Sequence, residues 1–327
     1  MVRSGYATLI VLQCASAAYT GSIASRATPP DLTSCSAHQG EWAAAKLSLR
    51  NPSCCVVSVS GLDYHLSVLK EHFCSPGGPS DLDLRMRVRC GENEVRGVGI
   101  SRAYEDCYKI YKSITEPSSV KDSVNEFCSG FDVDPSGIPV AHPCVLALEA
   151  LARGVSSLAD GPLEGVCTDV HMRVVFASSY EAKDPMFHTD KCPLRGYVTL
   201  AGPGTEYMNR TCFPWEYAAL RTLGAEDSSH VKGLRVAESF IVMKGDYYDA
   251  PLPDGITPSV LQKVLGKVWM RGAACVHRSP PADGRSWRRV ILSLDLADGG
   301  DDQEWYEYNK KRGWRSGMTQ RKSRLVA

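Results

Sequence analysis

The chain has no long apolar run and no excess of charge of either sign. None of its apolar segments approaches the roughly 18 uninterrupted residues of a membrane-spanning helix. Its 37 basic and 37 acidic residues cancel, so no net field attracts nucleic acid or an anionic membrane surface. With 43% hydrophobic and 23% charged residues, the composition is that of an ordinary globular protein. We therefore expect neither a membrane span nor a nucleic-acid partner.

The chain also lacks the cysteine spacing of common metal and redox motifs. It contains 13 cysteines, an odd number, but no Cys-x-x-Cys pair. Cys54 and Cys55 are adjacent, and such a pair is poorly suited to an ordinary disulfide. We interpret most of the cysteines as reduced, buried small hydrophobic residues. A secreted protein would instead need several disulfides.

The first 28 residues are typical of a targeting segment rather than of a folded element. Arg3 precedes the mostly apolar segment Tyr6–Ala18, which ends in the small residues Ala15-Ser16-Ala17. This arrangement is typical of a secretory signal peptide. An organellar transit peptide fits about as well, because no acidic residue precedes Asp31. Without cleavage, the protein would be cytoplasmic.

Residues 29–160 combine helical and strand patterns. Apolar residues recur at helical spacing over Gly61–Cys74, and Pro76-Gly77-Gly78 then ends the predicted helix. Residues 82–88 alternate apolar and charged side chains, which predicts an amphipathic strand. Two further helices are predicted over Val120–Phe127 and Cys144–Leu158. We expect this region to pack against a barrel built by the C-terminal half.

Residues 161–297 contain short strands separated by turn residues, which favours a barrel or sandwich. The predicted strands are His171–Ala177, Tyr197–Leu200, Val236–Lys244, Lys263–Met270 and Val290–Leu294, with a helix inserted over Pro214–Leu223. Together with the N-terminal helices, these strands predict an α+β fold. Residues 298–327 form an acidic block followed by a basic block without apolar periodicity, which predicts a disordered tail.

Two stretches of the C-terminal half form one candidate metal site. His188 and Asp190 are separated by one residue, so both side chains leave the same face of an extended strand. His277 is a third candidate ligand, and Arg288 and Arg289 follow it at the start of an apolar strand. Two histidines and one carboxylate with open positions form the facial triad of non-haem Fe(II) oxygenases. A following arginine suits a carboxylate-bearing co-substrate.

The same stretches resemble the DUF1826 family of uncharacterised proteins. The residues that carry the resemblance are His188, Asp190, Leu194, Arg195 and Gly202–Glu206 in a first block, and His277–Pro281 and Arg289–Asp295 in a second block. The resemblance covers roughly the C-terminal half of the chain. It implies no activity, because the family is uncharacterised.

The order of these residues is also similar to the 2-oxoglutarate/Fe(II)-dependent dioxygenase superfamily. This resemblance implies a double-stranded β-helix, a jelly-roll barrel, as the core of the C-terminal half, with helices packed outside. It implies that His188, Asp190 and His277 hold Fe(II), which 2-oxoglutarate chelates. Arg289 fits the co-substrate arginine at the head of the strand, and Arg288 is the alternate. The implied activity oxidises a substrate that no motif in the chain identifies.

Two cysteines leave a second class of function open. Cys192 follows Asp190 by two residues and Cys275 precedes His277 by two, so both thiols could share the ligand faces of their strands. A site of histidines and cysteines is closed and prefers zinc. The alternative is therefore a zinc-binding or metal-handling protein without catalytic turnover. The iron site requires both thiols to point away from the ligands.

Overall fold

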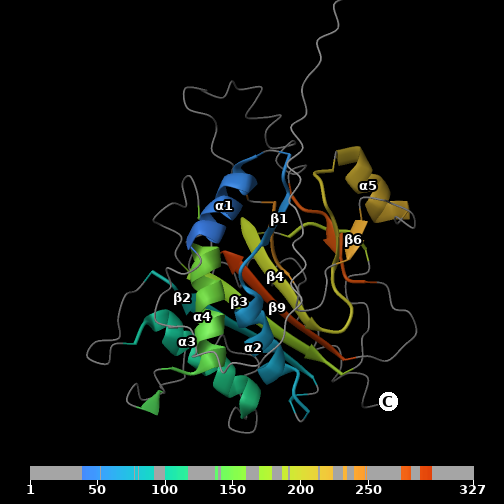
Figure 1. Cartoon of the computed structure of the whole chain (residues 1–327). Helices are drawn as coiled ribbons and strands as arrows, with labels where there is room; N and C mark the ends of the chain where they lie inside the picture. Colours follow the sequence, from blue (N-terminus) through green and yellow to red (C-terminus); the bar gives the residue numbers. More distant parts are fainter. Residues whose placement is uncertain are drawn as a thin grey trace, which may run out of the picture. The chain divides into compact units, whose positions relative to one another are not determined.

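The protein has a mixed α+β fold built around an antiparallel sheet (Figure 1). The computed structural model describes residues 39–51, 53–76, 78–79, 81–91, 100–116, 137–138, 141–159, 169–178, 186–190, 192–212, 214–223, 231–233, 239–246, 248, 274–280 and 288–296. The predicted targeting segment, the predicted helix over 120–127, the predicted strand over 263–270 and the charged tail lie outside these residues.

The described residues form helices mainly before residue 160 and strands mainly after it. The helices are α1 (Gln39–Arg50), α2 (Asp63–Phe73), α3 (Arg102–Thr115), α4 (Pro143–Ser156) and α5 (Pro214–Leu223). The strands are β1 (Val56–Val59), β2 (Leu82–Arg89), β3 (Asp169–Ala177), β4 (Leu194–Ala201), β5 (Glu206–Met208), β6 (Val231–Gly233), β7 (Phe240–Lys244), β8 (His277–Arg278) and β9 (Arg289–Leu296).

Six strands form the larger sheet, in the order β1-β7-β4-β9-β3-β2, and every neighbouring pair is antiparallel. Three further strands form a smaller antiparallel sheet in the order β6-β5-β8. β1 and β2 come from the N-terminal region but pair with β7 and β3. Strands from both sides of the predicted boundary at residue 160 therefore share the larger sheet.

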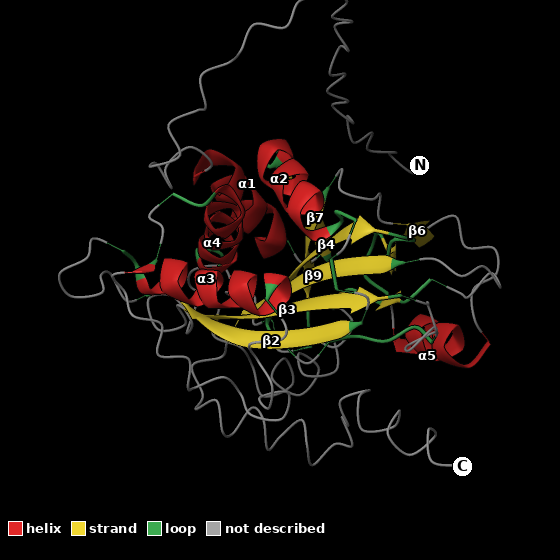
Figure 2. Ribbon diagram, turned by 90° about the horizontal axis from the view of Figure 1, so that it is seen from below, coloured by secondary structure: helices red, strands yellow, loops and turns green. Residues whose placement is uncertain are grey.

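One face of the larger sheet carries helices α1 to α4 (Figure 2). Alternate residues of β9, such as Leu292 and Leu294, are fully buried against these helices, whereas Ser293 and Asp295 lie on the opposite face. Each fully buried leucine stabilises the fold by about 1.5–3 kcal/mol. This apolar layer forms the main core, and it leaves the opposite face of the sheet for other contacts.

Two of the four helices, α1 and α3, are not predicted from the sequence. In α3, apolar residues recur at helical spacing, so the signal was present in the sequence, although Glu105 and Asp106 are also buried. Lys109 pairs with Glu105, and Arg89 of β2 forms a bidentate pair with Asp106. The apolar period of α3 was therefore available in the sequence and was missed, whereas the pairing of Asp106 with Arg89 is visible only in the folded chain.

The face of the larger sheet away from the helices contacts the smaller sheet through a second apolar cluster. Tyr197 and Ile241 of the larger sheet pack there with Cys55 and Cys275, and Tyr207 of β5 packs against them. Helix α5 packs separately, against the smaller sheet. Among the described residues, no helix is long and apolar enough to cross a membrane. The candidate ligands lie beside this second cluster.

Candidate metal site

His188 and His277 are paired through their backbones. The N–H of His188 donates to the carbonyl of His277 at 2.8 Å, and the N–H of His277 donates to the carbonyl of His188 at 2.9 Å. This reciprocal pairing is an isolated antiparallel bridge, so the two residues lie directly opposite each other. Their imidazole rings stand with centroids 4.4 Å apart. The backbone pairing therefore brings the two histidines together.

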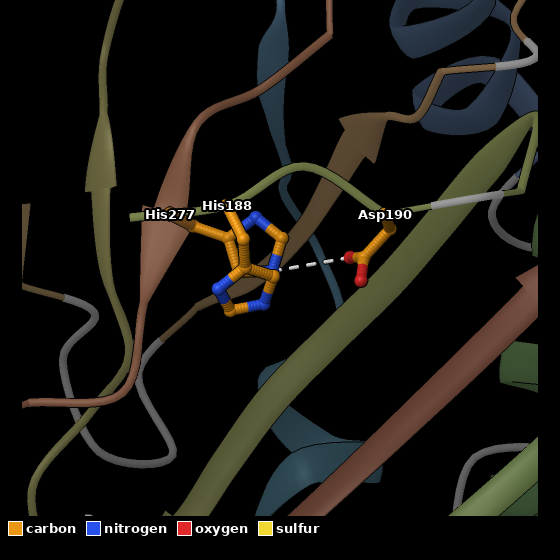
Figure 3. Close-up of side chains that lie close together, drawn as sticks. All are labelled: His188, Asp190 and His277. Carbon is orange, nitrogen blue, oxygen red and sulfur yellow. Dashed lines mark ion pairs between the residues drawn. The ribbon is translucent and has the colours of Figure 1, made fainter. Parts of the chain in front are cut away.

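Asp190 completes a three-residue cluster with these histidines (Figure 3). One potential ligand atom from each of His188, Asp190 and His277 lies within 4.8 Å of the others. Nε2 of His277 is 3.1 Å from Oδ2 of Asp190, and the His277 side chain is only 6% exposed. Within the described part of the chain, these three are the group of histidine, cysteine and carboxylate residues placed to hold a metal ion.

Both imidazole rings are oriented by main-chain carbonyls. Nδ1 of His188 is 3.0 Å from the carbonyl of Met186, and Nδ1 of His277 is 3.2 Å from the carbonyl of Cys275. A carbonyl can only accept, so each contact places a proton on Nδ1 and leaves Nε2 as the nitrogen that could bind a metal. Metal-binding histidines are commonly oriented in this way. The two Nε2 atoms are therefore the available ligand atoms.

The carboxylate of Asp190 is kept charged although it is buried. Burial raises the pKa of Asp190, but the nearby charges of Arg195 and His277 lower it by more. The net result is a pKa well below the ordinary value of an aspartate. Nη1 of Arg195 is 2.6 Å from Oδ1 of Asp190. The other oxygen, Oδ2, is buried and receives no well-formed hydrogen bond from any described residue. This oxygen suits a metal ligand.

Arg289 lies on the same face of the larger sheet as Tyr197. Its side chain is buried, and Nη2 donates to the hydroxyl of Thr205 at 3.0 Å and to that of Tyr197 at 3.3 Å. Nη1 is 3.5 Å from Oγ of Ser279, which follows His277 by two residues. A guanidinium with three hydroxyl groups around it is a suitable binding group for a carboxylate ligand.

Arg288 points to the other side of the sheet. Its guanidinium donates to the carbonyls of Phe73, Ser75 and Pro79, around the C-terminal end of α2. It also lies over the ring of Phe176, a residue of the helix-facing core. Of the two arginines considered from the sequence, Arg289 is therefore the one on the face of the sheet that carries Tyr197 and Arg195.

Neither cysteine of the zinc hypothesis is among the three clustered candidate ligands. Cys275 is buried in the apolar cluster between the sheets, where its thiol and that of Cys55 both face the carbonyl of Met208, at 3.7 Å and 3.6 Å. Cys192 is also buried, and burial raises the pKa of its thiol well above the ordinary value. The thiols of Cys192 and Cys275 are thus in environments that favour the neutral form.

Several polar partners of the site were not predicted from the sequence. They are Tyr197, Thr205, Ser279, Asp295 and Arg195, and all but Tyr197 were noted only as parts of the family motif. A local signal existed for two of them, because Arg195 and Asp295 are charged residues inside otherwise apolar strands. Such residues either face solvent or find a buried partner, and the sequence does not tell which.

Solved structures that are similar to this chain share little sequence with it. Dioxygenase for auxin oxidation 1 from Arabidopsis thaliana, in complex with 2-oxoglutarate, has 10% identity over 79% of this chain and 93% of its own, with a TM-score of 0.40. A putative oxygenase from Shewanella oneidensis has 12% identity over 84% and 96%, with a TM-score of 0.35. A BsmA homologue from Methylobium petroleophilum has 10% identity over 79% and 94%, with a TM-score of 0.35.

The sequence comparison is more specific. No curated protein matches the chain. The family described as a protein of unknown function, DUF1826, matches residues 108–295, which is more than half of the chain. That span contains His188, Asp190, His277 and Arg289. The chain belongs to the DUF1826 family.

Proposed function

We propose that this protein is a non-haem Fe(II)/2-oxoglutarate-dependent dioxygenase whose substrate is unknown. One observation carries the proposal: the cluster of His188, Asp190 and His277 lies on the same side of the sheet as a buried arginine, Arg289. Two histidines and one carboxylate with open positions are the ligand set of non-haem Fe(II) oxygenases. The arginine adds a place for a dicarboxylate co-substrate.

The three residues fit a divalent metal ion. Ligand atoms bound to one such ion at roughly 2.1 Å lie roughly 3 to 4 Å from one another. The three candidate atoms already lie within 4.8 Å, so only a small closure is needed. In addition, Oδ2 of Asp190 is buried and receives no well-formed hydrogen bond from any described residue, as expected for an atom that serves a metal. His188, Asp190 and His277 would hold the ion.

Arg289 would hold the distal carboxylate of 2-oxoglutarate. Its guanidinium offers a planar fork, and the hydroxyls of Tyr197 and Thr205 lie at 3.3 and 3.0 Å from the same nitrogen, Nη2. Ser279, the third hydroxyl near Arg289, belongs to the histidine strand segment, because it lies two residues after His277. When bound, Fe(II) and 2-oxoglutarate would supply the oxidising chemistry with dioxygen. The chain's own residues bind and orient both.

The two sheets support a jelly-roll interpretation of the core. The larger and the smaller sheet are both antiparallel, and Tyr197, Tyr207 and Ile291 pack between them. In a double-stranded β-helix, ligands bind between two such sheets. Here the histidine pair joins β8 of the smaller sheet to the segment that leads into β4 of the larger one. The site therefore lies where the two sheets meet.

A zinc protein without turnover is the competing function. A closed zinc site needs four protein ligands. The described cluster has three members, and neither Cys192 nor Cys275 is one of them. This arrangement favours an open site over the closed zinc site of the alternative.

Metal content and co-substrate binding together test the proposed function. The protein is purified without added metal and its metals are measured; 2-oxoglutarate is then titrated calorimetrically into the Mn(II)-loaded protein without oxygen. We expect one metal ion per chain and saturable 2-oxoglutarate binding that disappears when the metal is removed. Tightly held zinc with no 2-oxoglutarate binding would establish the alternative instead.

A further inference from the structure

The two carboxylate oxygens of Asp190 have different partners. Oδ1 is 2.6 Å from Nη1 of Arg195. Oδ2 is 3.1 Å from Nε2 of His277. One oxygen of the carboxylate therefore contacts an arginine, and the other faces His277. A metal held by the histidines would meet only the second oxygen.

Arg195 is itself held by a second carboxylate. Its Nε donates to Oδ1 of Asp295 at 2.5 Å, and its Nη2 donates to Oδ2 of Asp295 at 2.6 Å. The two residues lie directly opposite each other on β4 and β9. Because a guanidinium is planar, this two-point contact fixes the direction of the remaining nitrogen, Nη1. That nitrogen points at Asp190.

This arrangement connects a metal ligand to the centre of the larger sheet. Asp190 belongs to no strand, whereas β4 and β9 are neighbouring central strands whose other faces are packed against helices. The side chains of Asp190 and Asp295 are each 12% exposed and that of Arg195 is 21% exposed. Water therefore has little access to replace the contact. The position of Asp190 depends on the sheet through Arg195.

The charges of the pair nearly cancel at the metal. Arg195 alone would repel a divalent cation, but Asp295 holds an opposite charge against it at hydrogen-bond distance. The pair therefore adds little net charge to the site. Its effect on a bound ion is to orient Asp190.

We propose that Arg195, fixed by Asp295, is a positioning residue that occupies Oδ1 of Asp190 and leaves Oδ2 as the only carboxylate ligand atom. This inference rests on the proposed metal site. A carboxylate that bound through both oxygens would occupy one more coordination position. By preventing this, Arg195 keeps positions open for a co-substrate and for oxygen. Partners that orient metal ligands typically change metal affinity by about 10- to 100-fold.

A second buried pair on the same sheet provides a matched control. Arg173 of β3 forms a bidentate pair with Asp83 of β2, with both contacts at 2.7 Å. Its side chain is 28% exposed, close to the 21% of Arg195. The carboxylate that Arg173 holds belongs to Asp83, which is not a candidate ligand, whereas Arg195 touches Asp190. Loss of either pair should affect folding stability alike, but only loss of Arg195 should affect the metal.

The test is a calorimetric titration of Mn(II) into the full-length, metal-free protein. The variants are Arg195→Lys, the uncharged double variant Arg195→Gln/Asp295→Asn, and the controls Arg173→Lys and Arg173→Gln/Asp83→Asn. Lysine keeps the charge but lacks the planar fork that holds Asp295 at two points and directs a third nitrogen at Asp190. We expect both Arg195 variants to bind Mn(II) about 10- to 100-fold more weakly than the wild type, and both controls to stay within about twofold. The visible spectrum of the Co(II) form should change in the Arg195 variants alone.

The outcomes separate this inference from the proposed metal site. If the wild type binds Mn(II) and the Arg195 variants bind it equally well, the positioning role is wrong and the metal site stands. Equal losses in the Arg173 controls would also overturn the role, because they would show a general effect of stability. If the wild type itself binds no metal, both proposals fall. Should the Arg195 variants not fold, Asp295→Asn takes their place under the same criteria, because it frees Arg195 from its two-point contact.

Discussion

Arg288 and Arg289 are consecutive residues whose guanidinium groups lie on opposite sides of the larger sheet. Arg288 donates to carbonyls at the C-terminal end of α2, at 3.1 Å for Phe73, whereas Arg289 donates to the hydroxyl of Thr205 at 3.0 Å on the site side. Because successive side chains alternate across a strand, one position decides between a structural contact and a ligand contact. Because of this alternation, a substitution of Arg288 can serve as the control for the same substitution of Arg289.

Arg289→Ala should weaken 2-oxoglutarate binding by about 2–5 kcal/mol, because it removes one partner of a buried charge pair. Arg289→Lys should weaken it less, since lysine retains the charge without the fork. Binding is measured calorimetrically on the Mn(II) form without oxygen. Arg288→Ala is the matched control and should bind 2-oxoglutarate as the wild type does. Loss of binding in Arg288→Ala alone would transfer the role to that residue.

His188→Ala and His277→Ala should each lower the metal content sharply, because each removes one of three protein ligands. The fold should survive, since the backbone pairing between these two residues does not use their side chains. Metal content is measured by elemental analysis after dialysis, and folding by circular dichroism. His72→Ala is the control, because His72 stacks near His142 and Tyr111 on the helical side, far along the chain from the candidate ligands. Unchanged metal in both site variants would show that the triad is wrong.

Cys192→Ser and Cys275→Ser should leave the metal content nearly unchanged. Neither thiol belongs to the described ligand cluster, and Cys275 faces the carbonyl of Met208 instead. Cys275→Ser should cost some stability, because a hydroxyl replaces a thiol in a fully buried apolar cluster. Elemental analysis and urea unfolding measure the two effects separately. Loss of metal in either variant would favour the zinc alternative.

Gly154→Ala should destabilise the protein by about 1–3 kcal/mol through overpacking, even though alanine favours helices. A Cβ at this position of α4 would lie 2.1 Å from ring atoms of Trp42 in α1. Gly40→Ala is the control, because nothing lies within 4 Å of a Cβ there, and it should be neutral or stabilising by up to about 1 kcal/mol. Urea unfolding midpoints measure both. Equal stability of the two variants would mean that α1 and α4 do not pack closely at Gly154.

Local patterns predicted many elements of this fold. The helix predicted over Gly61–Cys74 is α2, and the one predicted over Cys144–Leu158 is α4, which begins at Pro143. The strand predicted over residues 82–88 is β2. These elements follow the apolar period of their own residues, so no distant contact is needed to recognise them. α1, α3 and β1 were not predicted. The apolar period of α3 is present in its own residues and was missed, whereas β1 is only four residues long and is identified by its pairing with β7.

The candidate ligands were recognised for the same local reason. His188 and Asp190 are two residues apart, and His277 precedes an arginine-led strand, so the types and order of the residues pointed to one kind of chemistry. The polar residues that contact these ligands could not be recognised from local sequence. Arg195 and Asp295 are one hundred residues apart and meet only because β4 and β9 pair in one particular register.

The sequence by itself therefore determined the periodicity of individual elements and the set of groups available for a metal site. Only the tertiary structure decided that Arg289 rather than Arg288 lies on the face of the sheet that carries Tyr197. It also decided that Cys275 lies with Cys55 outside the ligand cluster, and that Arg195 contacts Oδ1 of Asp190. The physical reason is that a shift of one residue in strand register sends every side chain to the other face. Register is set by burial over the whole sheet, which no local stretch of sequence contains.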